Sequence, residues 1–209
     1  MKLALRIPWT MLALVCIAGC DDNGPAGPAV PLYLVGPTGN FRSIGAAINA
    51  APEGEIIEVQ AGSYAERVVI NKRGIKLRGT SAVLDGALLD GLGIGIHIAG
   101  TADVEVSGFT VRNFERGVVV ENATNASVQR NEVHSNTSKA GNTAPPLSPG
   151  VSLFEGVVLI GAVNTQVIDN VLRNNGHDGV MLLGGSRNNT IRNNRIRDNG
   201  VQTTPGLFG

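Results

Sequence analysis

Cysteine and histidine are scarce in this sequence, and their positions exclude several kinds of site. The two cysteines, Cys16 and Cys20, both lie near the N-terminus, so the chain beyond them has no internal disulfide. The three histidines, His97, His134 and His177, are far apart, and no zinc-type ligand spacing occurs. A glycine-rich phosphate loop is also lacking. These absences exclude a disulfide scaffold, a zinc site and a P-loop nucleotide site.

The sequence also lacks an excess of positive charge. Lysine and arginine total 17, as do aspartate and glutamate, so the formal net charge is zero. If an N-terminal signal carrying Lys2 and Arg6 is removed, 15 basic residues face 17 acidic ones. Modules that bind nucleic acids are normally basic. We therefore expect no nucleic-acid partner.

The N-terminus has the layout of a secretory signal. Lys2 and Arg6 precede an apolar stretch, residues 9–18, that is too short to span a bilayer, which needs about 20 apolar residues. The small residues directly before Cys20 resemble the lipobox of bacterial lipoproteins. That resemblance implies a signal peptide over residues 1–19 and lipidation of Cys20. Residues 20–31 are then a flexible tether, and the protein is anchored to a membrane of the cell envelope, facing the periplasm or the exterior.

A repeat of about 22 residues dominates the rest of the chain. Gly95, Gly117, Gly156 and Gly179 each begin a similar apolar segment, with spacings of 22, 39 and 23 residues. The long spacing equals one repeat plus an insertion of 17 residues, which we place at 138–154.

Apolar columns persist from repeat to repeat. Each falls on a short run with alternating polarity, which is typical of strands rather than helices. The columns are Val106, Val128, Val167 and Ile191; Val111, Val133, Leu172 and Ile196; and Ile98, Val120, Leu159 and Leu182. Three strands per repeat predict an all-β solenoid, a single-stranded parallel β-helix with coils of about 22 residues over residues 32–209.

Asparagines form further columns in these repeats. Stacked identical amides can hydrogen-bond along a stack, so we interpret the columns as structural ladders rather than catalytic groups. They are Asn125, Asn164 and Asn188; Asn131, Asn170 and Asn194; and Asn136, Asn175 and Asn199. Phe109 and Phe114 take the second and third column positions one repeat earlier, so the stacks are expected to change there from aromatic to amide.

The N-terminal part predicts a cap followed by the first coils. Residues 41–51 have Ile44 and Ile48 four apart, as in a short amphipathic helix that covers one end of the core. Strands are expected at 55–59, 67–70, 75–77 and 82–84. The segment 41–72 resembles the opening of pectin-lyase-like β-helix proteins, including pectin methylesterases and the periplasmic accessory proteins of nitrous oxide reductase. The resemblance implies a right-handed β-helix but not one activity, because that superfamily contains lyases, hydrolases, esterases, epimerases and binding proteins.

One outward column carries cations. Arg112, His134, Arg173 and Arg197 follow the residues of a core column, so they are predicted to form a strip along one face. Arginine suits bidentate contact with the carboxylates of an acidic polysaccharide, and we consider this strip a substrate-binding surface. The alternative is a solvated face whose charge is balanced by Glu115, Glu132 and Asp198.

His177 and Asp178 are the candidate catalytic residues. A neighbouring His and Asp at a turn can act as general acid and base or as part of a metal site, although an Asp-Gly pair is also common in plain turns. Some calcium-dependent β-helix pectate lyases carry Asp-Asp-Gly-x-Asp at a comparable turn. Here His177, Asp178 and Met181 take the three aspartate positions, so Ca²⁺ is unsupported and no cofactor is expected.

Two features concern possible partners. Val158, Ile160, Met181 and Leu183 are predicted to form an outward apolar patch, covered by the insertion 138–154 or by a partner. After Asn199 no capping helix follows, so we expect either end-to-end pairing with a second copy or a longer β-helix of which this chain is a fragment.

Three functions remain open from the sequence. The first is an envelope-anchored lipoprotein that binds polysaccharide. The second is a polysaccharide lyase or epimerase that acts on uronate-containing glycans. The third is a noncatalytic structural or assembly protein of the surface.

Overall fold

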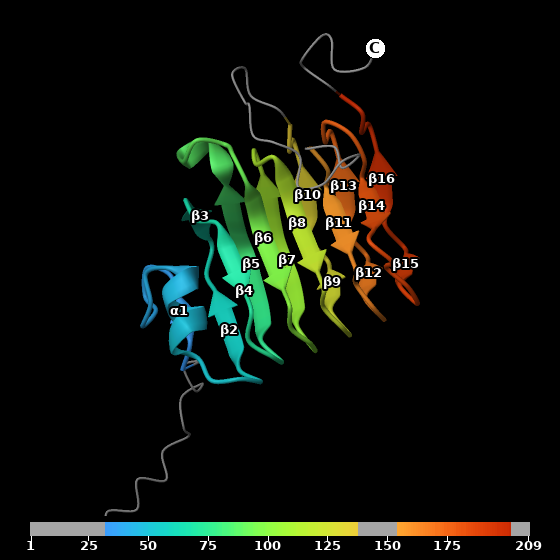
Figure 1. Ribbon diagram of the computed structural model, residues 1–209. Helices are drawn as coiled ribbons and strands as arrows, with labels where there is room; N and C mark the ends of the chain where they lie inside the picture. Colours follow the sequence, from blue (N-terminus) through green and yellow to red (C-terminus); the bar gives the residue numbers. More distant parts are fainter. Residues whose placement is uncertain (1–31, 138–153, 202–209) are drawn as a thin grey trace, which may run out of the picture.

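Two parallel sheets run along the length of the protein in the computed structural model, which describes residues 32–137 and 154–201. One sheet has five strands in the order β14-β11-β8-β6-β4. Its strands are β4 (Val68–Ile70), β6 (Ile94–Ala99), β8 (Arg116–Glu121), β11 (Val157–Ile160) and β14 (Val180–Leu183). Every strand pairs in parallel with the strand one coil away, as Figure 1 shows. This confirms the predicted solenoid.

The second sheet has eleven strands and bends within each coil. Its N-terminal strands are β1 (Leu34–Val35), β2 (Ile56–Val59), β3 (Gly62–Tyr64), β5 (Lys76–Asp85) and β7 (Glu105–Arg112). Its C-terminal strands are β9 (Ser127–Gln129), β10 (Glu132–His134), β12 (Gln166–Ile168), β13 (Val171–Arg173), β15 (Thr190–Arg192) and β16 (Arg195–Arg197). The strands expected at 75–77 and 82–84 are one strand, β5, with a register irregularity between Arg78 and Ala82.

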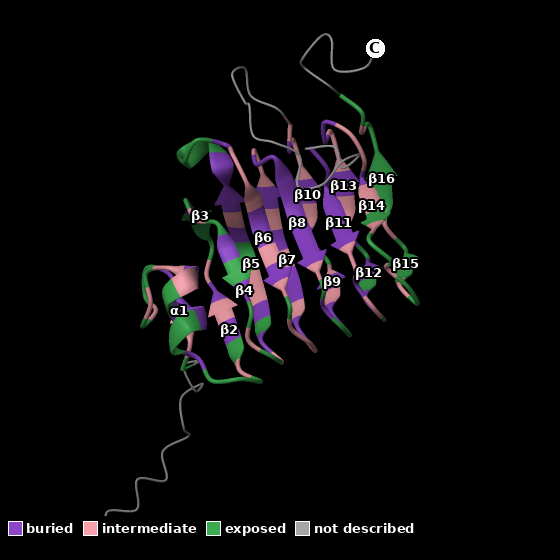
Figure 2. Ribbon diagram, viewed as in Figure 1, coloured by how far each residue is buried: buried purple, intermediate pink, exposed green. Residues whose placement is uncertain are grey.

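The predicted columns are in register. Val133 pairs with Val111 and with Leu172, and the other two apolar columns align in the same way. Most of their side chains are fully buried, and together they form one core along the solenoid axis. The last coil is different, because β15 and β16 consist of exposed residues, drawn green in Figure 2.

A short helix covers the N-terminal end of this core, as predicted. α1 (Ile44–Ala50) begins at Ser43, whose hydroxyl accepts a hydrogen bond of 3.1 Å from the Ala46 amide. The carboxylate of Glu66 accepts from the amides of Ile44 and Gly45, both at 2.9 Å, which places negative charge at the helix N-terminus. A 3₁₀ turn, η1 (Gly86–Leu88), follows β5.

Two asparagine columns form buried ladders. Asn131 donates to Asn170 and Asn170 donates to Asn194, over 3.2 and 3.0 Å. Asn136, Asn175 and Asn199 repeat this arrangement one bend later. The amides of Phe109 and Phe114 donate to the first asparagine of each ladder, so the expected change from aromatic to amide is confirmed.

The third asparagine column is different from the prediction. Asn125, Asn164 and Asn188 are exposed, with φ angles of 55°, 54° and 58°. Asparagine adopts this left-handed conformation more readily than most residues because its side chain bonds locally. Asn164 donates to Asn125 over 3.4 Å, so part of the predicted stack is present, but it lies at exposed turns between the sheets and not in the core.

The repeated glycines have a packing role that their spacing did not reveal. A Cβ on Gly117 would lie 2.2 Å from Cγ1 of Val133 and 2.6 Å from the carbonyl oxygen of Gly156. Gly95, Gly156 and Gly179 are confined in the same way. Glycine is therefore required at the point where each coil enters the five-stranded sheet, because a larger side chain would overlap its neighbours there.

Candidate functional site

The basic strip exists as a column on one face of the eleven-stranded sheet. Asp85, Arg112, His134, Arg173 and Arg197 are successive partners across strands β5, β7, β10, β13 and β16. Neighbouring strands lie about 4.8 Å apart, so each coil adds one side chain at a regular interval. We call the four residues from Arg112 to Arg197 the basic column, and Asp85 precedes it.

The arginines of the basic column are in ion pairs. Arg112 lies 2.8 Å from Asp85, and Arg197 lies 2.6 Å from Asp198. Arg173 donates to Glu132 from two nitrogens, over 2.9 and 2.7 Å. Their exposed fractions are 40%, 47% and 26%, so all three guanidinium groups remain accessible to a ligand. Of the three compensating carboxylates that the sequence suggested, Glu132 and Asp198 pair with the column, whereas Glu115 accepts from the Gly93 amide. Asp85, which the sequence analysis did not include, is the partner of Arg112.

Asp85 and His134 have shifted pKa values. Burial, the largest influence, raises the pKa of Asp85, but hydrogen bonds from Asn113, the Ala87 amide and Arg112 outweigh it and hold that pKa below its ordinary value. Burial, followed by the charge of Arg173, lowers the pKa of His134. His134 is therefore uncharged at neutral pH, and its Nδ1 lies 3.0 Å from the Ser135 hydroxyl.

Arg195 belongs to the same face, although the sequence analysis did not select it. It pairs with Val171, which pairs with Glu132 in the outward column beside the basic column. Arg195 is exposed, and within the described residues no ion pair holds it. The alternation Arg195-Ile196-Arg197 was the available signal, because residues two apart on a strand lie on one face.

The candidate catalytic pair lies in the turn before β14. Nδ1 of His177 is 2.8 Å from Oδ2 of Asp178, and the two side chains are 31% and 45% exposed. The His177 amide donates to Phe154 and the Gly156 amide to the Asp178 carbonyl, both over 2.9 Å. This register places Glu155 beside Asp178 in the neighbouring coil.

A buried ion pair adjoins this turn and was missed from the sequence. Nε of Arg116 lies 3.3 Å from Oε2 of Glu155, with exposed fractions of 3% and 0%. The two residues are 39 positions apart because the insertion separates their coils. Both directly precede a repeat glycine, and that shared position was the available signal.

The turn does not fit a calcium site. Of the three positions that carry aspartate in the pectate lyase motif, only that of Asp178 has a carboxylate here. Met181 on β14 occupies the third of these positions. Across residues 32–137 and 154–201, no three His, Cys, Asp or Glu side chains gather in a way that could hold a metal.

The predicted apolar patch is largely buried. Val158 pairs with Val119 and Met181, and both valines have no exposed surface although they lie on the outward side of the sheet. Ile160, Met181 and Leu183 are partly buried. The covering segment that we expected, 138–154, lies outside the described residues except for Phe154.

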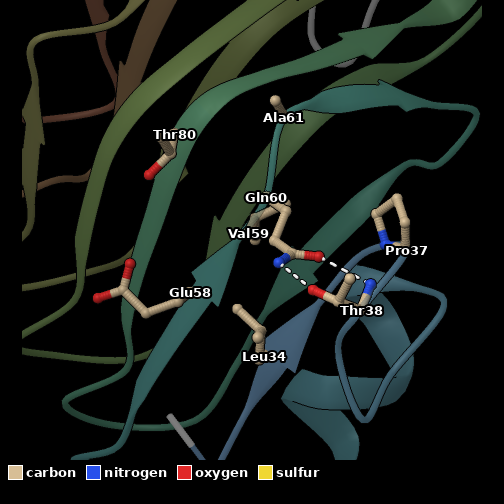
Figure 3. A pocket seen from close by; sticks show the side chains of 8 residues that line it. All are labelled: Leu34, Pro37, Thr38, Glu58, Val59, Gln60, Ala61 and Thr80. Atoms are coloured by element: carbon tan, nitrogen blue, oxygen red, sulfur yellow. Dashed lines mark hydrogen bonds between the residues drawn. The ribbon is translucent and has the colours of Figure 1, made fainter. Parts of the chain in front are cut away.

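An open hollow of about 600 Å³ lies at the N-terminal end (Figure 3). It is lined by Leu34, Pro37, Thr38, Glu58, Val59, Gln60, Ala61 and Thr80. Gln60 donates to the Thr38 hydroxyl over 2.6 Å and accepts from the Thr38 amide over 3.1 Å, as the dashed lines in Figure 3 show. Its single carboxylate, Glu58, provides no acid–base pair, so the basic column and the His177 turn remain the candidate sites.

The predicted lipidation site lies outside the described residues. Cys20 and the tether precede the described residues. Within the described residues, no helix is long and apolar enough to cross a membrane.

Comparison with solved structures concerns the fold. Pectate lyase Pel9A superposes with a TM-score of 0.57 and 15% identity, over 80% of this chain and 51% of that chain. This chain thus spans about half the length of Pel9A. A pectin methylesterase mutant in complex with a hexasaccharide gives a TM-score of 0.42 and 13% identity, over 77% of this chain and 68% of that chain. No curated protein matches the sequence.

The family comparison covers most of the chain. The family model described as the right handed beta helix region matches residues 61–204. The match includes every coil that carries the basic column and the His177 turn, and it gives the solenoid its right-handed sense. The chain therefore belongs to the right-handed β-helix family.

Proposed function

We propose that the basic column, together with Arg195, binds an acidic polysaccharide. The observation that carries the proposal is the in-register placement of cations from Arg112 to Arg197 along one face. With His134 uncharged, Arg112 and Arg173 lie two coils apart, about 9.6 Å. Arg173 and Arg197 are one coil apart, about 4.8 Å, so three guanidinium groups lie along one line. A row of cations along one line suits an extended polymer with repeated carboxylates better than a single small anion.

The existing ion pairs are compatible with such a ligand. Exposed ion pairs contribute only about 0–1 kcal/mol, so an arginine can share its donors with a glycan carboxylate at little cost. Arg195 has no carboxylate partner to displace within the described residues, which makes it the strongest anchor for a ligand. Its planar guanidinium group can form two parallel hydrogen bonds to one carboxylate.

Affinity electrophoresis tests this proposal. The full chain is run through gels that contain polygalacturonate, alginate or a neutral glucan, at low and at high salt. We expect retardation by the two acidic polymers that weakens as salt rises, because charge–charge contacts are screened. Unchanged mobility in both acidic gels would overturn the proposal.

We also propose that the protein is a lipoprotein of the cell envelope. The support is the lipobox-like sequence that ends at Cys20, followed by the tether 20–31. Cys20→Ser is expected to move the protein from the membrane fraction to the soluble fraction and to remove the acyl mass from its N-terminal peptide. An unchanged membrane fraction would contradict lipidation of Cys20.

A uronate lyase or epimerase is the second candidate, supported by the 2.8 Å contact between His177 and Asp178. In the lyase reaction His177 would take the proton at C5 of a uronate. The electron pair of that C–H bond forms the C4=C5 double bond, and the C4–O bond breaks, so the leaving oxygen takes up a proton. Asp178 would hold the imidazole in position. Ultraviolet absorbance of the unsaturated product should rise with the native chain and not with His177→Ala. Full activity of that variant would exclude the assignment.

A noncatalytic assembly role is the third candidate. Leu182, Ile191 and Ile196 belong to core columns but are 45%, 39% and 48% exposed in the last coil. Exposed apolar surface and strand edges favour association. Light scattering should then show self-association that is reduced by Ile196→Lys, and a monomer at all concentrations would contradict this role.

A further inference from the structure

His97 and Glu121 form a hydrogen-bonded pair on the outward side of the five-stranded sheet, away from both candidate sites. Nε2 of His97 lies 2.9 Å from Oε2 of Glu121, and the side chains are 23% and 38% exposed. His97 pairs directly with Val69 and Val119, whereas Glu121 pairs with Ala99. The contact is therefore diagonal, between one strand of the sheet and the next.

The pair defines the chemistry of the imidazole. A carboxylate accepts hydrogen bonds, so the His97 nitrogen that faces Glu121, Nε2, carries the hydrogen. In the neutral ring Nδ1 is then an acceptor with its lone pair available. Within the described residues Nδ1 of His97 forms no hydrogen bond. The arrangement is a partly exposed proton acceptor that a carboxylate holds in one orientation.

The fold does not require a histidine at this position. The same outward column contains Val69, Val119, Val158 and Met181, which are all apolar. The side chain of Val69 is 49% exposed directly beside His97, so an apolar surface and a proton acceptor face solvent together. A sugar ring has this combination of C–H faces and hydroxyl groups.

We propose that His97, oriented by Glu121, is the hydroxyl-binding residue of a second ligand site, whose ligand is a carbohydrate ring that packs against Val69. A ring hydroxyl donates its hydrogen to Nδ1 of His97, and the C–H face of the ring covers Val69. This site recognises hydroxyl groups, whereas the basic column recognises carboxylates. The choice of a carbohydrate as ligand rests on the proposed function.

Nitrogen NMR of the imidazole rings in the full chain tests the proposal. The His97 signals are assigned with His97→Gln, and cellohexaose and hexagalacturonate are added separately at millimolar concentrations. We expect the Nδ1 resonance of His97 to shift saturably with at least one of them, while the tautomer stays fixed. If neither hexasaccharide moves this resonance, the proposal is overturned, and the contact between His97 and Glu121 has a structural role only.

Two matched variants test whether the contact between Glu121 and His97 supports ligand binding or is only structural. Glu121→Gln should weaken the hexasaccharide affinity measured at His97 about tenfold, through the loss of one charge-assisted hydrogen bond. Glu105→Gln, which alters the pair with Arg78 on the other sheet, should leave that affinity unchanged. Equal effects of the two variants would contradict the proposal.

The column and the His97 site are distinguished by a third variant. Arg173→Gln combined with Arg195→Gln should abolish retardation in acidic gels and leave the response of His97 to cellohexaose intact. If the gels show no binding by the native chain but His97 still responds, the column proposal fails and the His97 site stands. If the gels show binding and His97 stays silent, the reverse holds.

Discussion

Asn175 occupies the centre of a buried amide ladder, and its truncation provides a sharp test of how the solenoid is held together. The side chain has no exposed surface. Its Nδ2 donates to the Val133 carbonyl over 3.2 Å and to Asn199 over 3.0 Å. Its Oδ1 accepts from the amide and the side chain of Asn136, over 3.2 and 3.0 Å. Four hydrogen bonds across three coils therefore depend on one residue.

The size of the effect follows from the groups that lose their partners. Asn175→Ala leaves the buried Asn136 amide hydrogen without its acceptor and removes three further hydrogen bonds. The unsatisfied amide costs about 1–3 kcal/mol and each lost hydrogen bond about 0.5–1 kcal/mol, so the free energy of unfolding should fall by about 3–5 kcal/mol. Asn164, in the same coil, is exposed and has a φ of 54°. Asn164→Gly, which suits that backbone conformation, should change stability by less than about 0.5 kcal/mol.

Urea unfolding followed by circular dichroism measures both variants. The midpoint for Asn175→Ala should lie far below that of the native protein, and the midpoint for Asn164→Gly should coincide with it. A loss of less than about 1 kcal/mol for Asn175→Ala would refute the reasoning, since that is the value of a single ordinary hydrogen bond. Equal losses in the two variants would also refute it.

Three further predictions concern packing, the buried ion pair and pH. Gly117→Ala should destabilise the fold by about 3 kcal/mol or more, because its Cβ would overlap Val133. The control is Gly100→Asn, at a φ of 58° with open space around it, which should leave the midpoint of thermal unfolding unchanged. Arg116→Met should lower the free energy of unfolding by about 3–5 kcal/mol in urea unfolding, because it removes a buried cation that pairs with the buried carboxylate of Glu155. The pKa of His134 is below its ordinary value of 6.5 in the folded state, so the unfolded chain binds the proton first as pH falls. The free energy of unfolding should therefore decline below about pH 6.5. Unfolding measured at pH 7 and at pH 5 should show a smaller decline for His134→Gln than for the native chain.

The coil architecture could be predicted because it repeats. One inward residue per strand recurs at each coil, so columns such as Val111, Val133 and Leu172 are visible in the sequence and pair as expected. The same logic located the basic column. It failed for Asn164, because residue identity alone does not distinguish a buried ladder from a left-handed turn.

Contacts that do not follow the columns could not be predicted. His97 contacts Glu121 diagonally, and the number of positions between them, 24, does not equal one repeat. The insertion hid the pair of Arg116 and Glu155 by separating their coils. The ion pairs that now compensate the arginines were also only partly evident, since Asp85 precedes the recognisable repeats. Such contacts depend on side-chain reach and burial, which a one-dimensional pattern does not contain.

Isothermal titration calorimetry with a long oligogalacturonate measures whether the basic column binds an acidic polysaccharide. The native chain is compared with Arg173→Gln combined with Arg195→Gln, and with Arg187→Gln, an exposed arginine outside the basic column. The account predicts saturable binding that the double variant weakens about tenfold or more and that Arg187→Gln leaves unchanged. No binding by the native chain, or an equal loss in the two variants, would contradict it.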